Sequence, residues 1–170
     1  MEVLKKKGRD SRSRDSQDKA LSLCFKLLSY RMRSEEEIRE RLTRKGFSRE
    51  VIDGVVQELK EKGLINDREA AESFLRVAKE SRLLGKKGIK EFLYKRGISK
   101  DIIMELLEKF DEREGAEEIL RKRILKKIGG EIEGSLSRNQ EESIRAYLLR
   151  RGYEPETINE VFKKFREGKI

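Results

Sequence analysis

Apolar residues recur along the chain with the spacing of α-helices, and the same arrangement occurs three times. Each copy is centred on a glycine, at Gly46, Gly97 and Gly152. An isoleucine and a leucine precede the glycine at fixed distances, and another isoleucine follows it; around Gly46 these are Ile38, Leu42 and Ile52. The spacings place the apolar side chains on one face of each helix, so the chain contains three copies of one helical unit.

The residues at each glycine predict a helix, a tight turn and a second helix. Gly46 suits the left-handed conformation that commonly ends a helix, and the apolar Phe47 can fold back on the last turn. Ser48 then suits the N-cap of the next helix. The corresponding residues are Ile98 and Ser99 in the second copy, and Tyr153 and Pro155, a first-turn proline, in the third.

A further amphipathic helix precedes each pair, and no segment alternates like a strand. These helices are expected within DKALSLCFKLLSYRM, DREAAESFLRVAKESRLL and EREGAEEILRKRILKKI. We therefore predict an all-α protein of three tandem three-helix repeats, at 17–66, 67–110 and 111–170, in an elongated, curved array. The polar residues 1–16 are expected to be disordered, and the glycine-rich segment 129–139 to form a loop.

Composition excludes most reactive centres. The 170 residues contain no His and one Cys, Cys24, which leaves no disulfide within the chain, no standard zinc site and no histidine-based catalysis. GKKG at 85–88 lacks the spacing of a P-loop. We read its glycines as the opening of a helix, with an approach to phosphate as an open possibility. We predict no catalytic residue, no metal and no cofactor, and so no enzyme.

The chain shows no segment that would place it in or across a membrane. No apolar run approaches the roughly 20 residues that span a bilayer. The N-terminus also lacks the apolar segment of a secretory signal. We expect a soluble cytoplasmic monomer with no membrane partner.

The charge balance points to an anionic partner. Lys and Arg number 42 against 33 Asp and Glu, a net charge of +9, which favours polyanions or acidic proteins. The surface ion-pair networks of a thermophilic protein are an alternative source of the charge density. The basic candidates for contact with protein or DNA are Arg31, Arg33, Arg39, Arg44, Lys45, Lys86, Lys87, Lys90, Lys95, Arg96, Arg121, Lys122, Lys126, Arg145, Arg150 and Arg151.

Position along a helix separates these candidates. Cations in a last helical turn offset the helix dipole, so the pairs at 44–45, 95–96 and 150–151 have two open explanations, this structural role and contact with a partner. Lys86, Lys87 and Lys90 stand at the opposite, positive end of their helix, and the second repeat is the most basic of the three. That repeat is the first candidate for a central contact.

A helix-turn-helix protein that reads DNA sequence is disfavoured. Such a protein places the second helix of the pair in the major groove. Here the solvent face of that helix is acidic or balanced in all three copies, for example with Glu50, Asp53 and Glu58 in the first. These carboxylates would lie against phosphates.

Three short motifs resemble those of the RecX family, regulators of the RecA recombinase. They are Arg33-Ser34-Glu35, Lys45-Gly46-Phe47 and the Gly-Leu-Ile-Asn-Asp run from Gly63 to Asp67. The resemblance is good over 18–110 and weaker over 111–166. Where the family often has an aromatic residue after the last motif, this chain has Ala70. The resemblance implies three three-helix repeats, binding along the RecA filament, and modulation, usually inhibition, of strand exchange.

Three functional hypotheses follow. The first is a non-enzymatic regulator, an inhibitor in our reading, that lies in the groove of a RecA–DNA filament and alters its ATPase and strand exchange in DNA repair and recombination. The second is a repeat protein that binds single- or double-stranded DNA through phosphates, without sequence preference. The third is a helical adaptor for another protein. Binding assays with and without the recombinase separate them.

Overall fold

The computed structural model describes residues 2–128 and 136–169, with side chains described for 15–126 and 136–169. Within these ranges every regular element is a helix, which confirms the all-α prediction. The α-helices are α1 (Glu2–Leu28), α2 (Glu35–Arg44), α3 (Arg49–Glu61), α4 (Asp67–Arg76), α5 (Lys86–Tyr94), α6 (Lys100–Glu108), α7 (Arg113–Ile128), α8 (Arg138–Arg150) and α9 (Pro155–Arg166). A π-helical turn, η1 (Val77–Ser81), continues α4. Most of the expected loop at 129–139, residues 129–135, lies outside the described residues.

The chain divides into two compact units. The first contains Met1–Ser73 and Arg96–Ile98, and the second contains Phe74–Lys95 and Ser99–Ile170. The helices follow one another in the predicted order, three to each repeat. The exact limits of the three repeats, and the curved array, stay predictions.

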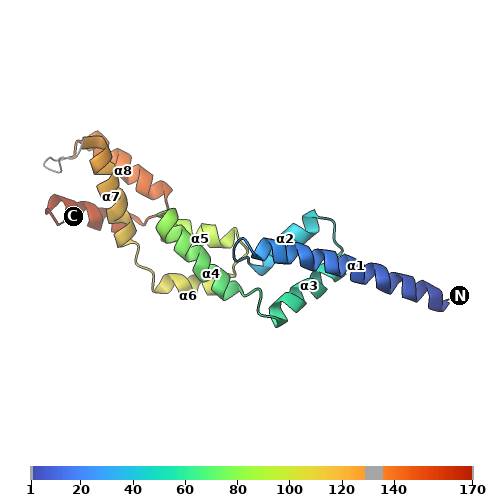
Figure 1. Ribbon diagram of the computed structural model, residues 1–170. Coiled ribbons are helices and arrows are strands. Elements are labelled where there is room, and N and C mark those ends of the chain that lie inside the picture. Colours follow the sequence, from blue (N-terminus) through green and yellow to red (C-terminus); the bar gives the residue numbers. More distant parts are fainter. Residues whose placement is uncertain (1, 129–135, 170) are drawn as a thin grey trace. The chain divides into compact units, whose positions relative to one another are not determined.

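The first unit is built on α1, α2 and α3. α1 and α2 each pack against α3, around a core that includes Cys24, Ile38, Leu42 and Val55. α1 continues past its two neighbours toward the N-terminus (Figure 1). Residues 2–16, which we expected to be disordered, belong to this helix. The segment has no proline and a single glycine, so nothing in it forces the helix to end.

The three turn glycines have the predicted conformation. Their φ angles are +82° at Gly46, +74° at Gly97 and +81° at Gly152. The Ser48 hydroxyl accepts a hydrogen bond from the Val51 N–H at 3.4 Å, as an N-cap should. Ser99 caps α6 in the same way, and Pro155 begins α9. The helix–turn–helix interpretation of the three copies is therefore confirmed.

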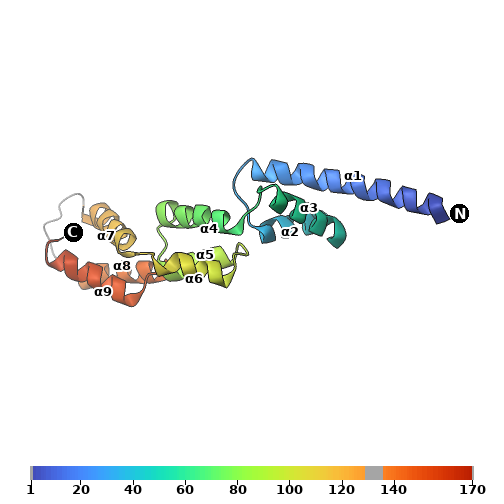
Figure 2. The same ribbon diagram turned by 90° about the horizontal axis from the view of Figure 1, so that it is seen from below.

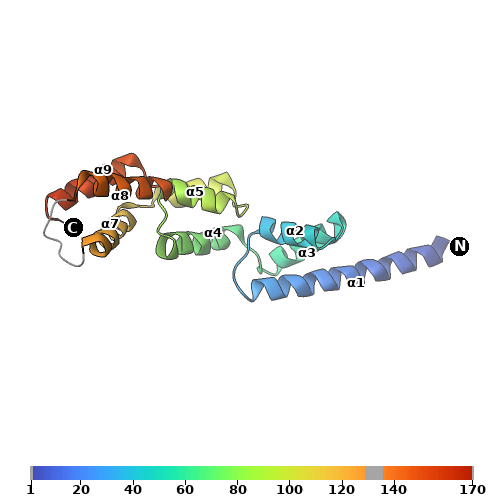
Figure 3. The same ribbon diagram turned by 90° about the horizontal axis from the view of Figure 1, so that it is seen from above.

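The second unit contains the last two helix triplets. α7, α8 and α9 pack on one another around Leu120, Ile144, Tyr153 and Phe162 (Figures 2 and 3). α5 packs on α6 and η1. None of the helices in the described part of the chain is both long and apolar enough to cross a membrane.

Candidate partner-binding surface

In the first repeat an arginine joins the two helices of the turn. Arg39 on α2 donates to Glu35 at 2.8 Å and to Asp53 on α3 at 2.6 Å. Hydrogen bonds to Asp53 first, and then to Glu35, raise the pKa of the Arg39 guanidinium. A hydrogen bond from Lys60 lowers the pKa of Glu35, with Arg39 adding to the effect. Arg39 is thus satisfied within the fold.

The third repeat contains the same arrangement at the same distances from its turn glycine. Arg145 on α8 contacts Glu141 at 2.8 Å and the Asn159 side chain on α9 at 2.8 Å. Its guanidinium also lies 4.3 Å from the centre of the Phe162 ring. We call these two arrangements the arginine brackets. Since both arginines already bind partners in the fold, their charge is largely accounted for by helix packing.

The second repeat breaks this pattern. Counted from Gly97, the bracket positions hold Lys86, Lys90 and Met104, so the arginine becomes a lysine and neither of its polar acceptors is present. Among the described residues, none of the side chains of Lys86, Lys87 and Lys90 forms an ion pair.

These three lysines border an open pocket of about 590 Å³. Met104, 55% exposed, lies on its wall. Glu105, Glu108 and Glu154 also line it. We call Lys86, Lys87, Lys90 and Met104 the lysine groove. It presents three lysine side chains that form no ion pair in the described structure, beside an exposed apolar side chain and the three carboxylates of the same pocket.

A buried carboxylate explains how lysines are tolerated at this end of α5. Glu112 is 3% exposed and accepts hydrogen bonds from the backbone N–H groups of Lys86, at 2.5 Å, and Glu154, at 2.8 Å. These N–H groups belong to the N-terminal ends of α5 and α9, where negative charge is favourable. Glu112 therefore offsets two positive helix ends at once. Sequence reasoning missed it, because one glutamate among many gives no signal of burial.

The GKKG segment packs against protein backbone. Gly85 is the N-cap of α5, so the predicted helix opening is confirmed. Its N–H donates to the Arg151 carbonyl at 3.0 Å, and the Lys87 N–H donates to the Gly152 carbonyl at 3.0 Å. A Cβ on Gly85 would stand 2.5 Å from the backbone of Tyr153. The close approach that we left open for phosphate is made here by the α8–α9 turn.

The candidates in the first unit are mostly paired. Arg31 binds Glu37 at 2.7 Å, and Arg44 binds Glu40 at 3.0 Å across one exposed helical turn. The Nε of Arg33 is buried without a hydrogen-bond partner. Burial first, and then nearby Arg31, lower the pKa of its guanidinium despite Glu37. Lys45 is exposed.

The remaining candidates lie just before the turn glycines of the second and third repeats, or on α7. The Arg96 carbonyl accepts a hydrogen bond from the Ser34 hydroxyl. The Nε of the Arg96 side chain lies 3.9 Å from the Glu37 carboxylate. Arg151 donates to the Arg82 carbonyl at 2.6 Å, which holds it in the fold. Lys95 and Arg150 are exposed at the ends of their helices, and Arg121, Lys122 and Lys126 are exposed on α7.

Comparison with known proteins decides the family. A family model described as the first three-helix domain of RecX matches residues 20–59. A Regulatory protein RecX from Mycobacterium leprae is 31% identical over 150 residues, covering 86% of this chain and 85% of the relative. One from Thermotoga petrophila is 32% identical over 164 residues, covering 96% and 95%. The chain belongs to the RecX family.

The fold agrees with solved RecX structures. The crystal structure of RecX from Lactobacillus salivarius matches with a TM-score of 0.75 at 24% identity, over 89% of this chain and 97% of that one. The described part of this RecX-family chain also holds no cluster of side chains suited to a metal ion. The relatives are named regulatory proteins.

Proposed function

We propose that this protein regulates a RecA-type recombinase by binding along the groove of its filament on DNA, without catalysing a reaction itself. The proposal is supported by membership of the RecX family and by the lysine groove, which is the observation that carries it. In this role the chain acts as a cytoplasmic monomer in DNA repair and recombination. A protein bound in the groove of the filament obstructs DNA entry, so we expect ATP turnover and strand exchange to fall.

The lysine groove suits such a contact because its side-chain charges do not hold the fold together. Removing Arg39 or Arg145 would also disturb helix packing, so their effect on binding cannot be separated from stability. Lys86, Lys87 and Lys90 have no such role in the described structure. Positive side chains at a rim speed association with an anionic partner and fix its register.

Repetition of the fold matches repetition in the target. A filament offers the same surface at regular intervals, and each three-helix repeat can meet an equivalent site. Once one repeat is bound, the others bind at a high effective concentration, so individually weak contacts add up. The first and third repeats then contribute with surfaces other than their arginine brackets.

The test compares two triple variants that each remove three positive charges. K86Q/K87Q/K90Q removes the three positive charges of the lysine groove. K19Q/K26Q/R49Q changes exposed residues of the first unit and serves as the matched control. ATPase, strand exchange and filament co-pelleting are measured on the cognate recombinase. Three contacts of about 0.5–1 kcal/mol each predict that the groove variant needs about ten- to a hundredfold more protein for half-maximal effect.

Two outcomes contradict the proposal at different levels. If saturating wild-type protein changes neither ATPase nor strand exchange and does not co-pellet, the chain is not a regulator of this filament. If the wild type acts and K86Q/K87Q/K90Q acts as well as the wild type, the function stands and the lysine groove is not its contact surface.

A plain phosphate-binding protein is the second candidate, since the same lysines suit a DNA backbone. It predicts binding to DNA alone, with an affinity that falls steeply as salt rises. K86Q/K87Q/K90Q should then lower the slope of log affinity against log salt by about 1 for each phosphate that the variant no longer binds. Binding at physiological salt that requires the recombinase favours the first candidate over this one.

A further inference from the structure

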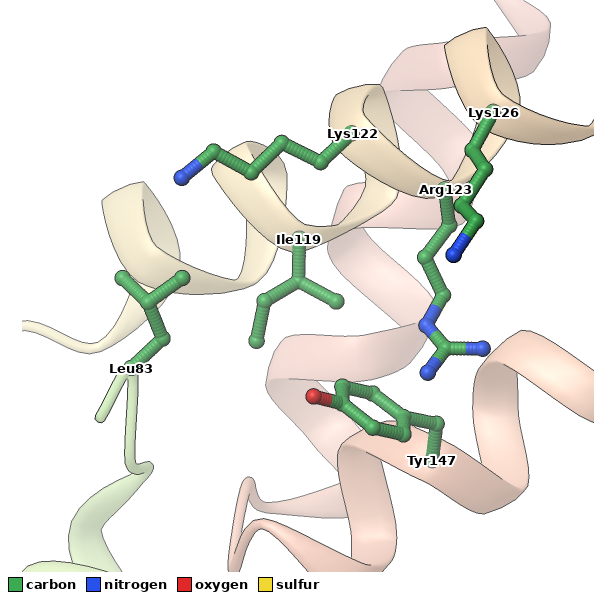
Figure 4. A pocket seen from close by; sticks show the side chains of 6 residues that line it. All are labelled: Leu83, Ile119, Lys122, Arg123, Lys126 and Tyr147. Carbon is green, nitrogen blue, oxygen red and sulfur yellow. The ribbon is translucent and has the colours of Figure 1, made fainter. Parts of the chain in front are cut away.

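A second basic pocket lies in the third repeat, away from the lysine groove. It opens between α7 and α8 and has a volume of about 410 Å³. That volume lies within the range of about 300–1,000 Å³ common for small-molecule sites. Its lining residues are Leu83, Ile119, Lys122, Arg123, Lys126 and Tyr147, shown in Figure 4.

The charges that line this pocket all have one sign. Lys122, Arg123 and Lys126 stand along α7, and no carboxylate is among the lining residues. Lys122 pairs with Glu118 at 2.6 Å, but both side chains are largely exposed and the pair is easily exchanged for a better anion. Three cations around one cavity suit a phosphate, which carries up to two negative charges, better than a single carboxylate.

One cation is held in place before any ligand arrives. The guanidinium of Arg123 lies over the Tyr147 ring, 3.6 Å from its centre, and Arg151 lies 5.1 Å from the same centre. Burial raises the pKa of Tyr147, but hydrogen bonds from these two arginines outweigh it and lower that pKa overall. Figure 4 shows the stacked pair forming one side of the cavity. A fixed guanidinium offers N–H donors in a rigid fork that matches the oxygens of a phosphate.

The other side of the pocket is apolar. Ile119 is buried at the base of the cavity, and Leu83 faces it from the segment before α5. Leu83 has a φ of +47°, a left-handed conformation that is strained for leucine. Its carbonyl accepts a hydrogen bond from the Tyr153 hydroxyl at 3.1 Å, which helps to hold it there. Strained residues of this kind gather at ligand sites.

Comparison between repeats shows that packing does not require this arrangement. Aligned on the alanines Ala20 and Ala116, the position of Arg123 on α7 corresponds to Leu27 on α1. In the first repeat an apolar side chain therefore fills the place that Arg123 takes here. A cation stacked on an aromatic ring replaces that apolar contact and leaves a charged cavity.

We propose that this pocket binds a nucleotide, with its phosphate among Lys122, Arg123 and Lys126 and its base or sugar against Leu83 and Ile119. The ligand is either a free nucleotide or one residue of a single strand, since both present the same chemistry. The site goes beyond the regulatory function proposed above and does not depend on it.

The test measures binding by calorimetry at low salt. The probes are adenosine 5′-monophosphate, adenosine, inorganic phosphate, a short oligodeoxythymidylate and an acidic peptide. The variants are R123L, which installs the residue of the first repeat, and K126Q at an exposed position; circular dichroism checks that both fold. K19Q/K26Q/R49Q, which changes exposed residues of the first unit, is the control, and its affinity for nucleotide should equal that of the wild type.

We expect the monophosphate or the oligonucleotide to bind, and R123L and K126Q to weaken that binding about tenfold or more. Binding of the monophosphate assigns a free nucleotide; binding of the oligonucleotide alone assigns a residue of a strand. The proposal is overturned if neither binds, if R123L and K126Q bind as well as the wild type, or if inorganic phosphate or the acidic peptide binds as tightly as the nucleotide.

Discussion

Replacing Glu112 with alanine should destabilise the second unit more than any change at a neighbouring acidic residue. Glu112 is buried and each of its carboxylate oxygens accepts one backbone N–H, from Lys86 and from Glu154. Alanine removes both acceptors together. The N-terminal ends of α5 and α9 are then each left without the negative charge that stabilised them.

The magnitude follows from these contacts. A buried donor left without a partner costs about 1–3 kcal/mol, and two donors are affected. Loss of a favourable charge at a helix end costs about 0.3–1 kcal/mol and overlaps with the same hydrogen bonds. Lys86 is partly accessible, so water can reach one donor. We therefore expect Glu112→Ala to lower the free energy of unfolding by about 3 kcal/mol.

Urea unfolding followed by circular dichroism measures this difference. Glu114→Ala is the matched control, because Glu114 lies in the first turn of α7 but is 81% exposed and pairs with Lys79 at 3.3 Å. The control should cost less than about 1 kcal/mol. Equal unfolding midpoints for the two variants would refute the role of Glu112 as a shared helix cap.

Four further predictions concern other residues. Gly88→Ala should destabilise the protein by about 2 kcal/mol in urea unfolding, because its Cβ would overlap a backbone carbonyl of the α8–α9 turn. Gly54→Ala, inside α3 with no atom of another helix nearer than 3.8 Å, should stabilise it by about 0.5–1 kcal/mol in the same assay. Burial raises the pKa of the Cys24 thiol to about 11, so iodoacetamide at pH 8 should label it, by mass spectrometry, only when urea unfolds the chain. Hydrogen bonds from Arg113 lower the pKa of Asp111 to about 2. The ionised Asp111 therefore stabilises the fold above its ordinary pKa near 4, and this stabilisation is lost as pH falls toward 2. Asp111→Asn should lose less stability than the wild type between about pH 5 and 2.5, measured by urea unfolding at each pH.

Local signals in the sequence predicted the helices and turns well. A glycine that needs a positive φ, an apolar residue after it and a serine or proline that begins the next helix act over a few residues, so they can be read without knowing the rest of the fold. Helix α1 was harder. Charged residues of the N-terminal segment predicted disorder, but the same residues are compatible with a helix that is already nucleated by Ala20 and Cys24 in the core.

Contacts between distant residues were not predictable in this way. Gly85 and Gly88 looked like a phosphate approach because the backbone that meets them lies far along the chain. Whether a lysine or arginine forms an ion pair likewise depends on which side chains the neighbouring helix brings beside it. For Arg39 and Lys90, however, the repeat itself held the signal: aligning the polar positions, as well as the apolar ones, shows which copy lacks the acidic partner.

The main-chain hydrogen bonds between the start of α5 and the α8–α9 turn have a consequence for separating the last two repeats. These bonds join amides to carbonyls, so they do not depend on the side chains around them, whereas a Cβ at Gly85 or Gly88 would overlap the facing backbone. A chain cut after Phe110 would expose the amides of Gly85 and Lys87 and remove Glu112, leaving the first turn of α5 uncapped. The first turn of α5 thus depends on residues 111–153 for its hydrogen-bond partners, and separating the two segments would remove them.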